Sequence, residues 1–323
     1  MSTTSQTNLS IPVGLTMSTI AAMVSRIYPS VEALSVAPLA GGNIHGVFEI
    51  TCAKPPTKLV LKIYADEYQW KMEKEAYVYG LLAGRPGVTA PTVLVTDASK
   101  TLWQQNYAIM TKLDGIMLRE AADSMSSDQL CSVYREMGLM LKQVHQIRFD
   151  AFGYIGTRVI EPKMSNADYM QCQFDKRLDE FERLGADPVI QQTIKSYVDA
   201  NTFLLGSCLS PSLCHNDFHD ANVMVSRETG RLVGILDVEN AVAGDPLLDI
   251  AKTAIYPSQG NGPKLECLLE GYGGLPPGGD ARIQIYQLYH SLELWDWMMA
   301  RDPSTPWLPA IAEDIWRLAR SGE

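Results

Sequence analysis

The stretch CHNDFHDANVMV, residues 214–225, places a dense group of polar side chains just before an apolar run. Within it, His215, Asp217 and Asn222 match the spacing H-x-D-x-x-x-x-N, which is typical of the catalytic loop of a phosphoryl-transfer enzyme. In such a loop the aspartate accepts the proton of an attacking hydroxyl, and the asparagine holds a metal ion on the phosphate side. Because eight residues can match by chance, the interpretation depends on partners elsewhere in the chain.

One partner follows the motif in the sequence. Asp237 ends the apolar, strand-like run VGIL and lies 20 residues after Asp217. The end of a strand can present a carboxylate to a metal ion, and the oxygens of Asn222 and Asp237 are of the kind that Mg²⁺ prefers in proteins. The sequence therefore predicts a magnesium site formed by these two residues.

The other parts of a kinase site lie near the N-terminus. Lys62 ends the apolar strand LVLK, from which a lysine could reach the phosphates of a nucleotide. Glu75 lies on a charged helical stretch 13 residues later and is predicted to pair with Lys62, with Glu73 as a rival. A glycine-rich turn precedes both and could bring backbone N–H groups to phosphates; it contains Gly41, Gly42 and Asn43. The order of these parts along the chain carries more weight than any one of them.

The coarse pattern predicts two lobes in an α+β fold. Residues 1–113 contain the β-rich segments SVAPL, GVFEIT, KLVLKIY, VLVT and YAIMTKL and one charged helix over 66–83. Residues 114–323 are mainly helical, with apolar residues on one face of the segment SSDQLCSVYREMGLMLKQVHQI and further helices over 166–184, 187–205, 280–300 and 307–320. The first lobe has 9 Lys and Arg against 7 Asp and Glu, whereas the second has 18 against 30.

Composition excludes several classes of protein. A net charge of −10 disfavours a nucleic-acid partner, because phosphate binding relies on clustered Lys and Arg. No apolar run reaches the roughly 18 residues that a membrane helix needs, and the polar N-terminus lacks the pattern of a secretion signal. Six cysteines without a CxxC pair indicate reduced thiols. We expect a cytoplasmic protein without a membrane partner, either a monomer or a homodimer.

With these residues in view, the chain resembles the aminoglycoside phosphotransferase family of small-molecule kinases. HNDFHDAN, residues 215–222, is similar to the family's HGDLHPGN, and LDVENAVAGDPLLDIA, residues 236–251, is similar to IDWEDAGIGDPLYDLA. The resemblance covers nearly the whole chain and implies a bilobal, protein-kinase-like fold that uses Mg²⁺ and ATP or GTP. It implies that Asp217 is the catalytic base, that Asn222 and Asp237 bind the metal, and that Lys62, oriented by Glu75, contacts nucleotide phosphates. The segment YAIMTKLDG would be the hinge strand, whose nucleotide-binding residues would be Thr111 and Leu113.

The chain also departs from the family pattern. Asn216 replaces the usual glycine, Val238 stands where an aromatic residue is common, and Asp220 replaces a proline or small residue. None of these changes removes a catalytic group. Asp220 adds a carboxylate that could touch metal or substrate, and Glu239 is a further substrate candidate.

Other polar residues have structural interpretations. His215 and His219 lie four residues apart on a loop with no further His or Cys ligand set, so we interpret them as loop-bracing groups rather than a metal site. His145 ends an apolar helix and is interpreted as a buried or helix-end histidine. Asp245 and Asp249 are expected to cap and anchor the helix that follows them.

The acceptor substrate is the least determined part. On the helix over 280–300, Tyr289, Glu293 and Asp296 share a face with Tyr286, and an aromatic and acidic surface suits a sugar or polyamine. A solvated face with the two tyrosines packing at its edge is an alternative of at least the same weight. The first hypothesis is a kinase that phosphorylates a hydroxyl of an aminoglycoside or other sugar-containing antibiotic and confers resistance. The alternatives are a metabolic kinase for choline, homoserine or a sugar, and a non-catalytic nucleotide-binding scaffold.

Overall fold

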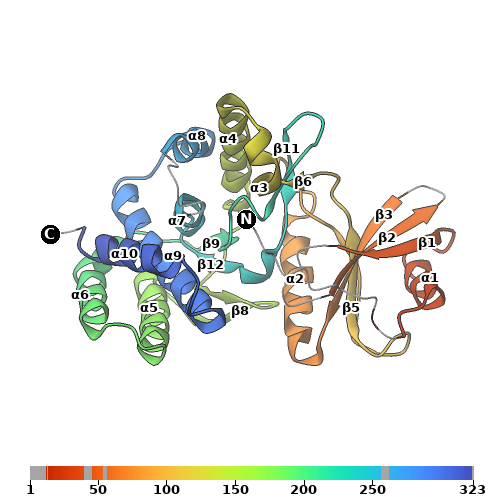
Figure 1. The fold of residues 1–323 in the computed structure, drawn as a ribbon, viewed down its shortest axis with the longest axis horizontal. Helices are drawn as coiled ribbons and strands as arrows, with labels where there is room; N and C mark the ends of the chain where they lie inside the picture. Colours follow the sequence, from red (N-terminus) through yellow and green to blue (C-terminus); the bar gives the residue numbers. More distant parts are fainter. Residues whose placement is uncertain (1–11, 13, 40–45, 54–56, 256–261, 322–323) are drawn as a thin grey trace. The chain divides into compact units, whose positions relative to one another are not determined.

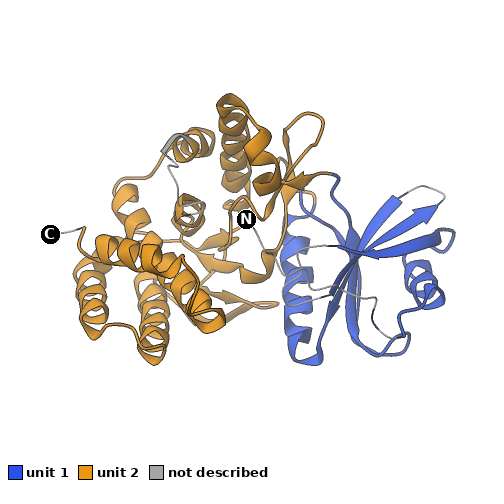
Figure 2. Cartoon of the chain, viewed as in Figure 1, with its two compact units in different colours: residues 1–83, 89–114 blue, residues 84–88, 115–323 orange. Residues whose placement is uncertain are grey.

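The computed structural model describes residues 12, 14–39, 46–53, 57–255 and 262–321, and it divides into two compact units (Figures 1 and 2). Unit 1 comprises residues 1–83 and 89–114, and unit 2 comprises residues 84–88 and 115–323. The sequence places its boundary after residue 113, whereas the chain enters unit 2 at Gly115 and the short segment 84–88 packs with unit 2.

Unit 1 is a five-stranded antiparallel sheet with helices. Its strands, in spatial order, are β1 (Glu32–Pro38), β2 (Gly46–Ala53), β3 (Thr57–Tyr64), β5 (Asn106–Thr111) and β4 (Val93–Asp97). The helices are α1 (Met17–Ser25), the short η1 (Asp66–Tyr68) and α2 (Gln69–Leu82). The strands and the charged helix predicted from the sequence are all present.

Alternation along β3 divides its side chains between the two faces of this sheet. Leu59, Leu61 and Ile63 belong to the apolar core that also contains residues of α1. Because successive side chains of a strand point to opposite faces, Lys62 and Tyr64 face away from that core. Both contact Glu75 of α2, so α2 covers the second face of the sheet at this point. The alternation therefore sets the direction of the lysine.

Unit 2 is mainly helical and includes two small sheets (Figure 1). One sheet has the order β11 (Leu232–Ile235), β10 (Val223–Val225), β6 (Ile116–Met117), and the other has the order β8 (Val159–Lys163), β7 (Phe152–Ile155), β12 (Val242–Gly244), β9 (Ser212–Cys214). The helices are α3 (Leu118–Ala121), η2 (Ala122–Ser124), α4 (Ser127–Val144), α5 (Asn166–Arg183), α6 (Pro188–Leu205), η3 (Val238–Asn240), α7 (Leu247–Ile255), α8 (Gly262–Tyr272), α9 (Gly279–Arg301) and α10 (Leu308–Ala319).

The helix α4 begins with a capping box. Ser126 is its N-cap and accepts a hydrogen bond from the backbone N–H of Gln129, while the Gln129 side chain accepts one from the Ser126 N–H. This reciprocal pair satisfies two of the free donors at a helix start. The apolar face of the helix, including Val133, Met137 and Leu141, is buried as the periodicity predicts.

The helices α4 and α8 pack closely and are joined by a disulfide, which corrects the expectation for the cysteines. A Cβ at Gly138 would lie 2.0 Å from the carbonyl oxygen of Leu268, and one at Gly271 would lie 1.9 Å from that of Arg135. Only glycine permits this approach of the two backbones. Beside it, Cys131 and Cys267 form a disulfide across 136 residues of sequence, so the expectation that all six thiols are reduced is wrong for this pair. The other four cysteines carry free thiols.

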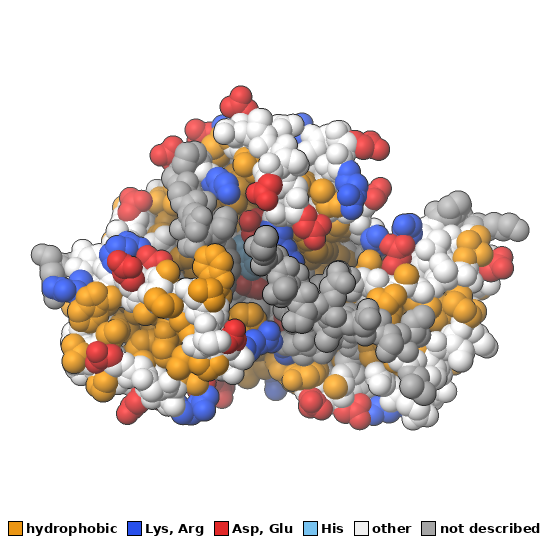
Figure 3. Space-filling model, in the orientation of Figure 1, with side chains coloured by type: hydrophobic (Ala, Val, Ile, Leu, Met, Phe, Trp, Pro, Cys, Tyr) orange, Lys and Arg blue, Asp and Glu red, His pale blue; other side chains and the backbone are white. Residues whose placement is uncertain are grey.

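The surface of unit 2 carries exposed hydrophobic side chains. In Figure 3 they gather over the region where Figure 1 draws α5, α6, α9 and α10. Val189 and Phe203 on α6 and Trp297 on α9 are among the exposed large hydrophobic residues.

Within the described part of the chain, every helix is too short or too polar to span a bilayer.

Candidate active site

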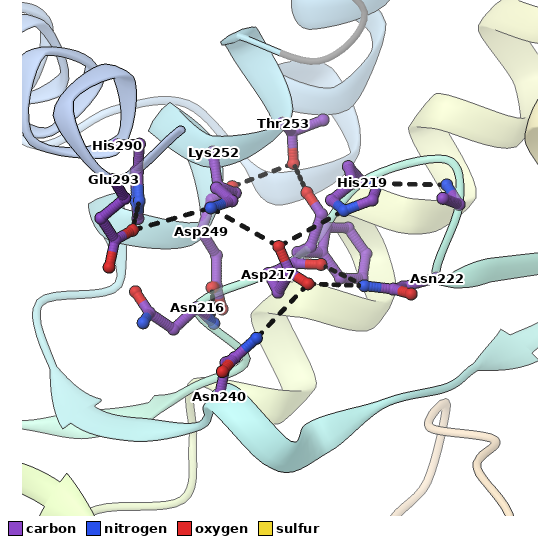
Figure 4. A network of polar contacts seen from close by, with 12 residues as sticks. Asn216, Asp217, His219, Asn222, Asn240, Asp249, Lys252, Thr253, His290 and Glu293 are labelled. Atoms are coloured by element: carbon purple, nitrogen blue, oxygen red, sulfur yellow. Dashed lines mark hydrogen bonds and ion pairs between the residues drawn. The ribbon is translucent and has the colours of Figure 1, made fainter. Parts of the chain in front are cut away.

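The loop between β9 and β10 contains the H-x-D-x-x-x-x-N motif, and hydrogen bonds to α7 hold it in place. Asp249 on α7 accepts hydrogen bonds from the backbone N–H groups of His215 and Asn216, at 2.8 and 2.6 Å. Thr253, one turn further along α7, donates from Oγ1 to the carbonyl oxygen of Phe218 at 2.7 Å. These bonds fix the backbone of the loop on both sides of Asp217 (Figure 4).

The loop geometry explains one departure from the family pattern. Asn216 has φ +61°, in the left-handed region that glycine occupies without penalty. Asparagine is one of the few other residues that tolerate this conformation. Asn216 therefore keeps the backbone turn that directs Asp217 into the site. Asp237, at φ +60°, occupies the same region.

The Asp217 carboxylate is surrounded by hydrogen-bond donors and cations (Figure 4). Its Oδ1 lies 3.3 Å from Nε2 of His219 and 3.5 Å from Nζ of Lys252. Its Oδ2 accepts hydrogen bonds from the side-chain amides of Asn222 at 3.1 Å and Asn240 at 3.5 Å. Both oxygens are thus oriented, and the four donors match the roughly four lone-pair sites of a carboxylate. A further donor would have to replace one of them, and the exposed Asn240 makes the longer of the two hydrogen bonds to Oδ2, at 3.5 Å.

The surroundings of Asp217 and His219 shift the pKa values of both side chains. Burial disfavours the charged carboxylate of Asp217, but the hydrogen bond from His219 and the charge of Lys252 outweigh it and hold the pKa well below its usual range. For His219, burial opposes the charged ring, and the hydrogen bonds to Asp217 and Asp220 outweigh this and raise its pKa. Asp217 is therefore an ionised acceptor at neutral pH.

Asn222 and Asp237 are brought together by backbone pairing. The N–H of Leu236, next to Asp237, donates to the carbonyl oxygen of Asn222 at 2.8 Å, and the β10–β11 ladder continues from there. The Asn222 amide nitrogen donates to the carbonyl oxygen of Asp217 at 2.8 Å, which turns the amide oxygen away from Asp217 (Figure 4). The backbone of Asn222 therefore lies next to the residue that precedes Asp237, and the side-chain oxygens of these two residue types are of the kind that Mg²⁺ prefers.

In unit 1, Lys62 and Glu75 are brought together as an ion pair, and 14% and 2% of their side chains are exposed. The second oxygen of Glu75 accepts a hydrogen bond from the buried hydroxyl of Tyr64. The rival Glu73 instead accepts a hydrogen bond from Gln69 at 2.9 Å on an exposed part of α2. Glu75, and not Glu73, is therefore the carboxylate that orients Lys62 in this structure.

The other residues predicted to bind the nucleotide are Thr111, Leu113 and those of the glycine-rich turn. Thr111 ends β5, and its hydroxyl accepts a hydrogen bond from the N–H of Thr92 at 2.9 Å, while Leu113 follows the strand and is half-buried. Gly41, Gly42 and Asn43 lie outside the described residues.

Three candidate substrate residues lie on α9, and two of them are buried. Tyr289 is 6% exposed and Asp296 is 3% exposed, so the expectation of an open aromatic and acidic surface is wrong. The reason is that α9 packs against α5, α6, α7 and α10, which cover more than one of its faces. Burial raises the pKa of Asp296 to about 7 despite the nearby Arg177. Glu293 keeps partial exposure.

Asp220 and Glu239 are both half-buried. The carbonyl oxygen of Asp220 accepts a hydrogen bond from the N–H of Arg119, and its Oδ1 lies 3.8 Å from Nδ1 of His219. Glu239 lies in η3, where its carbonyl oxygen accepts a hydrogen bond from the hydroxyl of Tyr154 at 3.2 Å.

The histidines and the neighbouring thiol have structural partners. His145 is buried at the C-terminus of α4 between Asp249 (Nε2 to Oδ2, 3.0 Å) and the hydroxyl of Tyr272 (2.9 Å). His215 bonds through Nε2 to the carbonyl oxygen of Leu236 at 2.8 Å. Although His145, Cys214 and Asp249 could surround a metal ion, burial raises the pKa of the Cys214 thiol, which favours its protonated form. His215 therefore braces the loop and His145 is a buried helix-end histidine, as the sequence suggests for each.

The sequence motifs do not reveal Lys252. Its ammonium lies between Asp217 and Glu293, at 3.5 and 3.7 Å. The one signal in the sequence is its position three residues after Asp249 on a helix, where side chains at i and i+3 share a face.

Comparison with known proteins decides the family. The model of the phosphotransferase enzyme family matches residues 35–316, which is most of the chain. The chain belongs to this family. The expectation of a small-molecule kinase that transfers a phosphoryl group to a hydroxyl is thereby confirmed. No curated protein sequence matches the chain.

Solved structures of other phosphotransferases share the fold. The aminoglycoside phosphotransferase APH(4)-Ia is similar with a TM-score of 0.71 and 17% identity, over 95% of this chain and 100% of that one. A candidate fructosamine-3-kinase from Thermobifida fusca YX-ER1 is similar with a TM-score of 0.66 and 19% identity, over 92% and 98%. A ternary complex of a thermostable APH(4)-Ia mutant with AMP-PNP and hygromycin B has a TM-score of 0.69 and 18% identity, over 94% and 99%. At these identities the similarity shows the fold, and the prediction of a kinase-like α+β fold is confirmed.

Proposed function

We propose that this phosphotransferase uses a magnesium-bound nucleoside triphosphate to phosphorylate a hydroxyl of a small, sugar-containing molecule, with an aminoglycoside-type antibiotic as the first candidate. The observation that supports this most lies in unit 2. There an ionised Asp217, with both carboxylate oxygens oriented, accepts a hydrogen bond from Asn222, whose backbone pairs with that of Leu236 next to Asp237. A carboxylate acceptor next to a hard-oxygen metal site is what phosphoryl transfer to an alcohol requires.

Asp217 would act mainly by orienting the acceptor. The acceptor hydroxyl donates a hydrogen bond to the carboxylate, its oxygen forms the new bond to the γ-phosphorus, and the bond from that phosphorus to the bridging oxygen of the nucleoside diphosphate breaks. The hydroxyl proton passes to Asp217 and then to solvent. Because the pKa of Asp217 is held low, proton transfer occurs late, when the phosphorylated oxygen has become acidic. A loose transition state needs little help from a strong base.

The residues that would hold the metal are Asn222, through its amide oxygen, and Asp237, through its carboxylate. Magnesium, when bound, neutralises negative charge on the phosphate oxygens. The backbone bond between Leu236 and Asn222 keeps these two ligands in register. The hydrogen bond from the Asn222 amide nitrogen to Asp217 ties the metal side of the site to the acceptor side.

In unit 1, Lys62 would contact the phosphates of the nucleotide. Glu75 and Tyr64 hold its ammonium in one position, so that less conformational freedom is lost when the nucleotide binds. Thr111 and Leu113 would lie in the hinge segment beside the base.

A fructosamine is the second candidate acceptor. The complex of the APH(4)-Ia mutant contains hygromycin B, which favours an antibiotic, while similarity to the Thermobifida fusca protein favours a fructosamine. On α9, Glu293 has Lys252 beside it, and burial raises the pKa of Asp296, so neither carboxyl group adds an uncompensated negative charge at neutral pH. In Figure 3, acidic and basic side chains are interspersed over unit 2. These features favour an acceptor recognised through hydroxyls as much as through its positive charge.

The test is a product screen. The protein is incubated with Mg²⁺ and ATP or GTP against hygromycin B, other aminoglycosides, fructosamines, free sugars, choline and homoserine, and products are detected by mass. We expect one acceptor class to gain a phosphoryl group. Expression in a susceptible bacterial host then distinguishes a resistance enzyme, which raises the inhibitory concentration of the antibiotic, from a metabolic kinase, which does not.

A further inference from the structure

One face of α7 is directed at the catalytic loop. Asp249, Lys252 and Thr253 lie at positions i, i+3 and i+4 of the helix, which place them on the same side. Asp249 and Thr253 bond to the loop backbone at His215, Asn216 and Phe218. Because the helix is fixed at both of these points, the direction of the Lys252 side chain is fixed as well.

The ammonium of Lys252 has an enclosed position. Its side chain is 9% exposed and lies 3.5 Å from Oδ1 of Asp217 and 3.7 Å from Oε2 of Glu293 (Figure 4). A buried ammonium is strongly unfavourable unless carboxylates surround it. Conversely, without this cation two carboxylates would face each other across the site, and their repulsion would displace one of them.

Glu293 connects this ion pair to α9. Its two oxygens accept a hydrogen bond from the hydroxyl of Tyr289 at 2.9 Å and contact Nδ1 of His290 at 2.9 Å. Burial opposes its ionisation, and the charge of Lys252 followed by the bond from His290 lowers its pKa to about 2. His290 bonds in turn to the carbonyl oxygen of Leu248 on α7. Glu293 is therefore a fixed anion on the far side of Lys252 from Asp217.

We propose that Lys252 is a positioning residue of the phosphotransferase site, whose ammonium bridges Asp217 and Glu293 and thereby holds the Asp217 carboxylate in its reactive orientation and couples it to α9. This inference rests on the proposed function, because it assigns Lys252 a role in the reaction of Asp217. Lys252 acts on the carboxylate oxygen Oδ1 and leaves Oδ2 to Asn222 and Asn240. Its effect is on turnover rather than on nucleotide binding.

The experiment uses a set of variants of the full chain. Lys252→Ala removes the ammonium and leaves space for a small amine, Lys252→Met keeps the length without charge, and Lys252→Arg keeps the charge. Lys176→Ala, on the exposed surface of α5 in the same unit, is the matched control. Turnover of ATP or GTP is measured with water as acceptor and with the acceptor that gives the largest wild-type rate in the product screen.

Lys252→Ala and Lys252→Met should lower kcat about 10- to 100-fold while the nucleotide KM changes less than about 3-fold, the range expected from losing a charge-assisted contact in the transition state. Methylammonium chloride should restore the Lys252→Ala rate in a saturable way. Tetramethylammonium chloride at the same ionic strength should not, because it cannot donate a hydrogen bond. Lys252→Arg should retain more activity than Lys252→Met, and Lys176→Ala should match the wild type.

A Lys252→Ala enzyme with kcat within about 3-fold of the wild type would overturn the inference. So would a loss that neither methylammonium nor Lys252→Arg repairs, because that pattern indicates packing alone. If Lys252→Ala does not fold, the comparison of Lys252→Arg with Lys252→Met decides in the same way. A wild-type protein without phosphoryl transfer to any acceptor or to water has a different signature, and it overturns the proposed function together with this inference.

Discussion

Each unit contains a nearly buried lysine beside carboxylates, and the two are built in different ways. Lys62 and Glu75 lie 13 residues apart, on a strand and the helix that follows it. Lys252 meets Asp217 from 35 residues away and Glu293 from 41, on a helix, a loop and another helix. The first pair follows from one turn of the chain, whereas the second needs the packing of unit 2 to be complete.

This difference separates two tasks within one enzyme. The pair in unit 1 orients a cation, and we assign it to the nucleotide phosphates. The cluster in unit 2 orients an anion, and we assign it to the acceptor hydroxyl. Changes in the two places should therefore move different kinetic constants, and the following variants test that separation.

Removal of a metal ligand should have the largest effect. Asp237→Ala should abolish phosphoryl transfer, and added Mg²⁺ should restore little, because the ion could no longer be held beside the phosphates. The measurement is product formation over a range of Mg²⁺ concentrations. Wild-type activity of this variant at ordinary Mg²⁺ would exclude Asp237 as a ligand.

Asp217→Asn should lower kcat by about 10² to 10⁴, the range for loss of a general base, while nucleotide affinity stays nearly unchanged. A residual rate from positioning is expected. Steady-state assays of product formation measure kcat, and titration with nucleotide in a calorimeter measures the nucleotide affinity. Turnover above a tenth of the wild-type value would show that another group accepts the proton.

In unit 1, Lys62→Ala should raise the nucleotide KM about 10- to 100-fold, as expected for loss of hydrogen bonds to a charged group. Glu75→Gln should produce the same change in weaker form, because the lysine remains but is no longer fixed. Glu73→Gln is the matched control on the same helix, where Glu73 bonds only to Gln69 among the described residues. If Glu73→Gln has the larger effect, the ion pair seen here is not the functional one.

Tyr64→Phe tests the positioning of Glu75 with the loss of one hydroxyl. Because an ordinary hydrogen bond contributes about 0.5–1.5 kcal/mol, the nucleotide KM should rise by a factor of about 2 to 10. The kcat for the bound nucleotide should change less than the KM. An effect on kcat alone would contradict the assignment of unit 1 to nucleotide binding.

The smallest effect concerns stability, at Asp296 in unit 2. Its pKa is raised to about 7 by burial, so the folded protein binds a proton that the unfolded chain has released above about pH 4. The free energy of unfolding should therefore fall as pH rises from about 4 to 7 and level off above that. Asp296→Asn should remove about 1–3 kcal/mol of this decline. Urea unfolding of both proteins at pH 5 and pH 8 measures this change in the free energy of unfolding. An equal decrease between the two pH values in the wild type and in Asp296→Asn would contradict the raised pKa.

Local patterns in the sequence were sufficient for much of the fold. The β-rich segment KLVLKIY predicts β3, and the amphipathic segment from Ser126 predicts α4. The helix α8 was not predicted, because Gly271 within it disfavours a helix locally and the contact with α4 that requires this glycine is visible only in the fold. The Cys131–Cys267 disulfide is hidden for the same reason, since the two residues are distant in sequence.

The residues of the site also divide into those that a local sequence pattern reveals and those that only the fold brings together. Asp217, Asn222 and Asp237 are recognisable because their spacing reflects one loop and one strand. Lys252 is not, because nothing in its own segment shows that α7 passes beneath the catalytic loop. The orientation of α9 was also beyond a periodicity argument: helical spacing groups Tyr289 with Asp296, but burial by neighbouring helices decides that the group is enclosed.

The central claim is that the Asp217 site transfers a γ-phosphoryl group to an acceptor hydroxyl. It is tested most directly by mass analysis of a candidate acceptor after incubation with Mg²⁺, a nucleoside triphosphate labelled in its γ-phosphoryl group, and either the wild-type protein or Asp217→Asn. The account predicts that the label appears on an acceptor oxygen with the wild type and is nearly absent with the variant. Equal labelling by both proteins, or nucleotide consumption that never labels any acceptor, would contradict it.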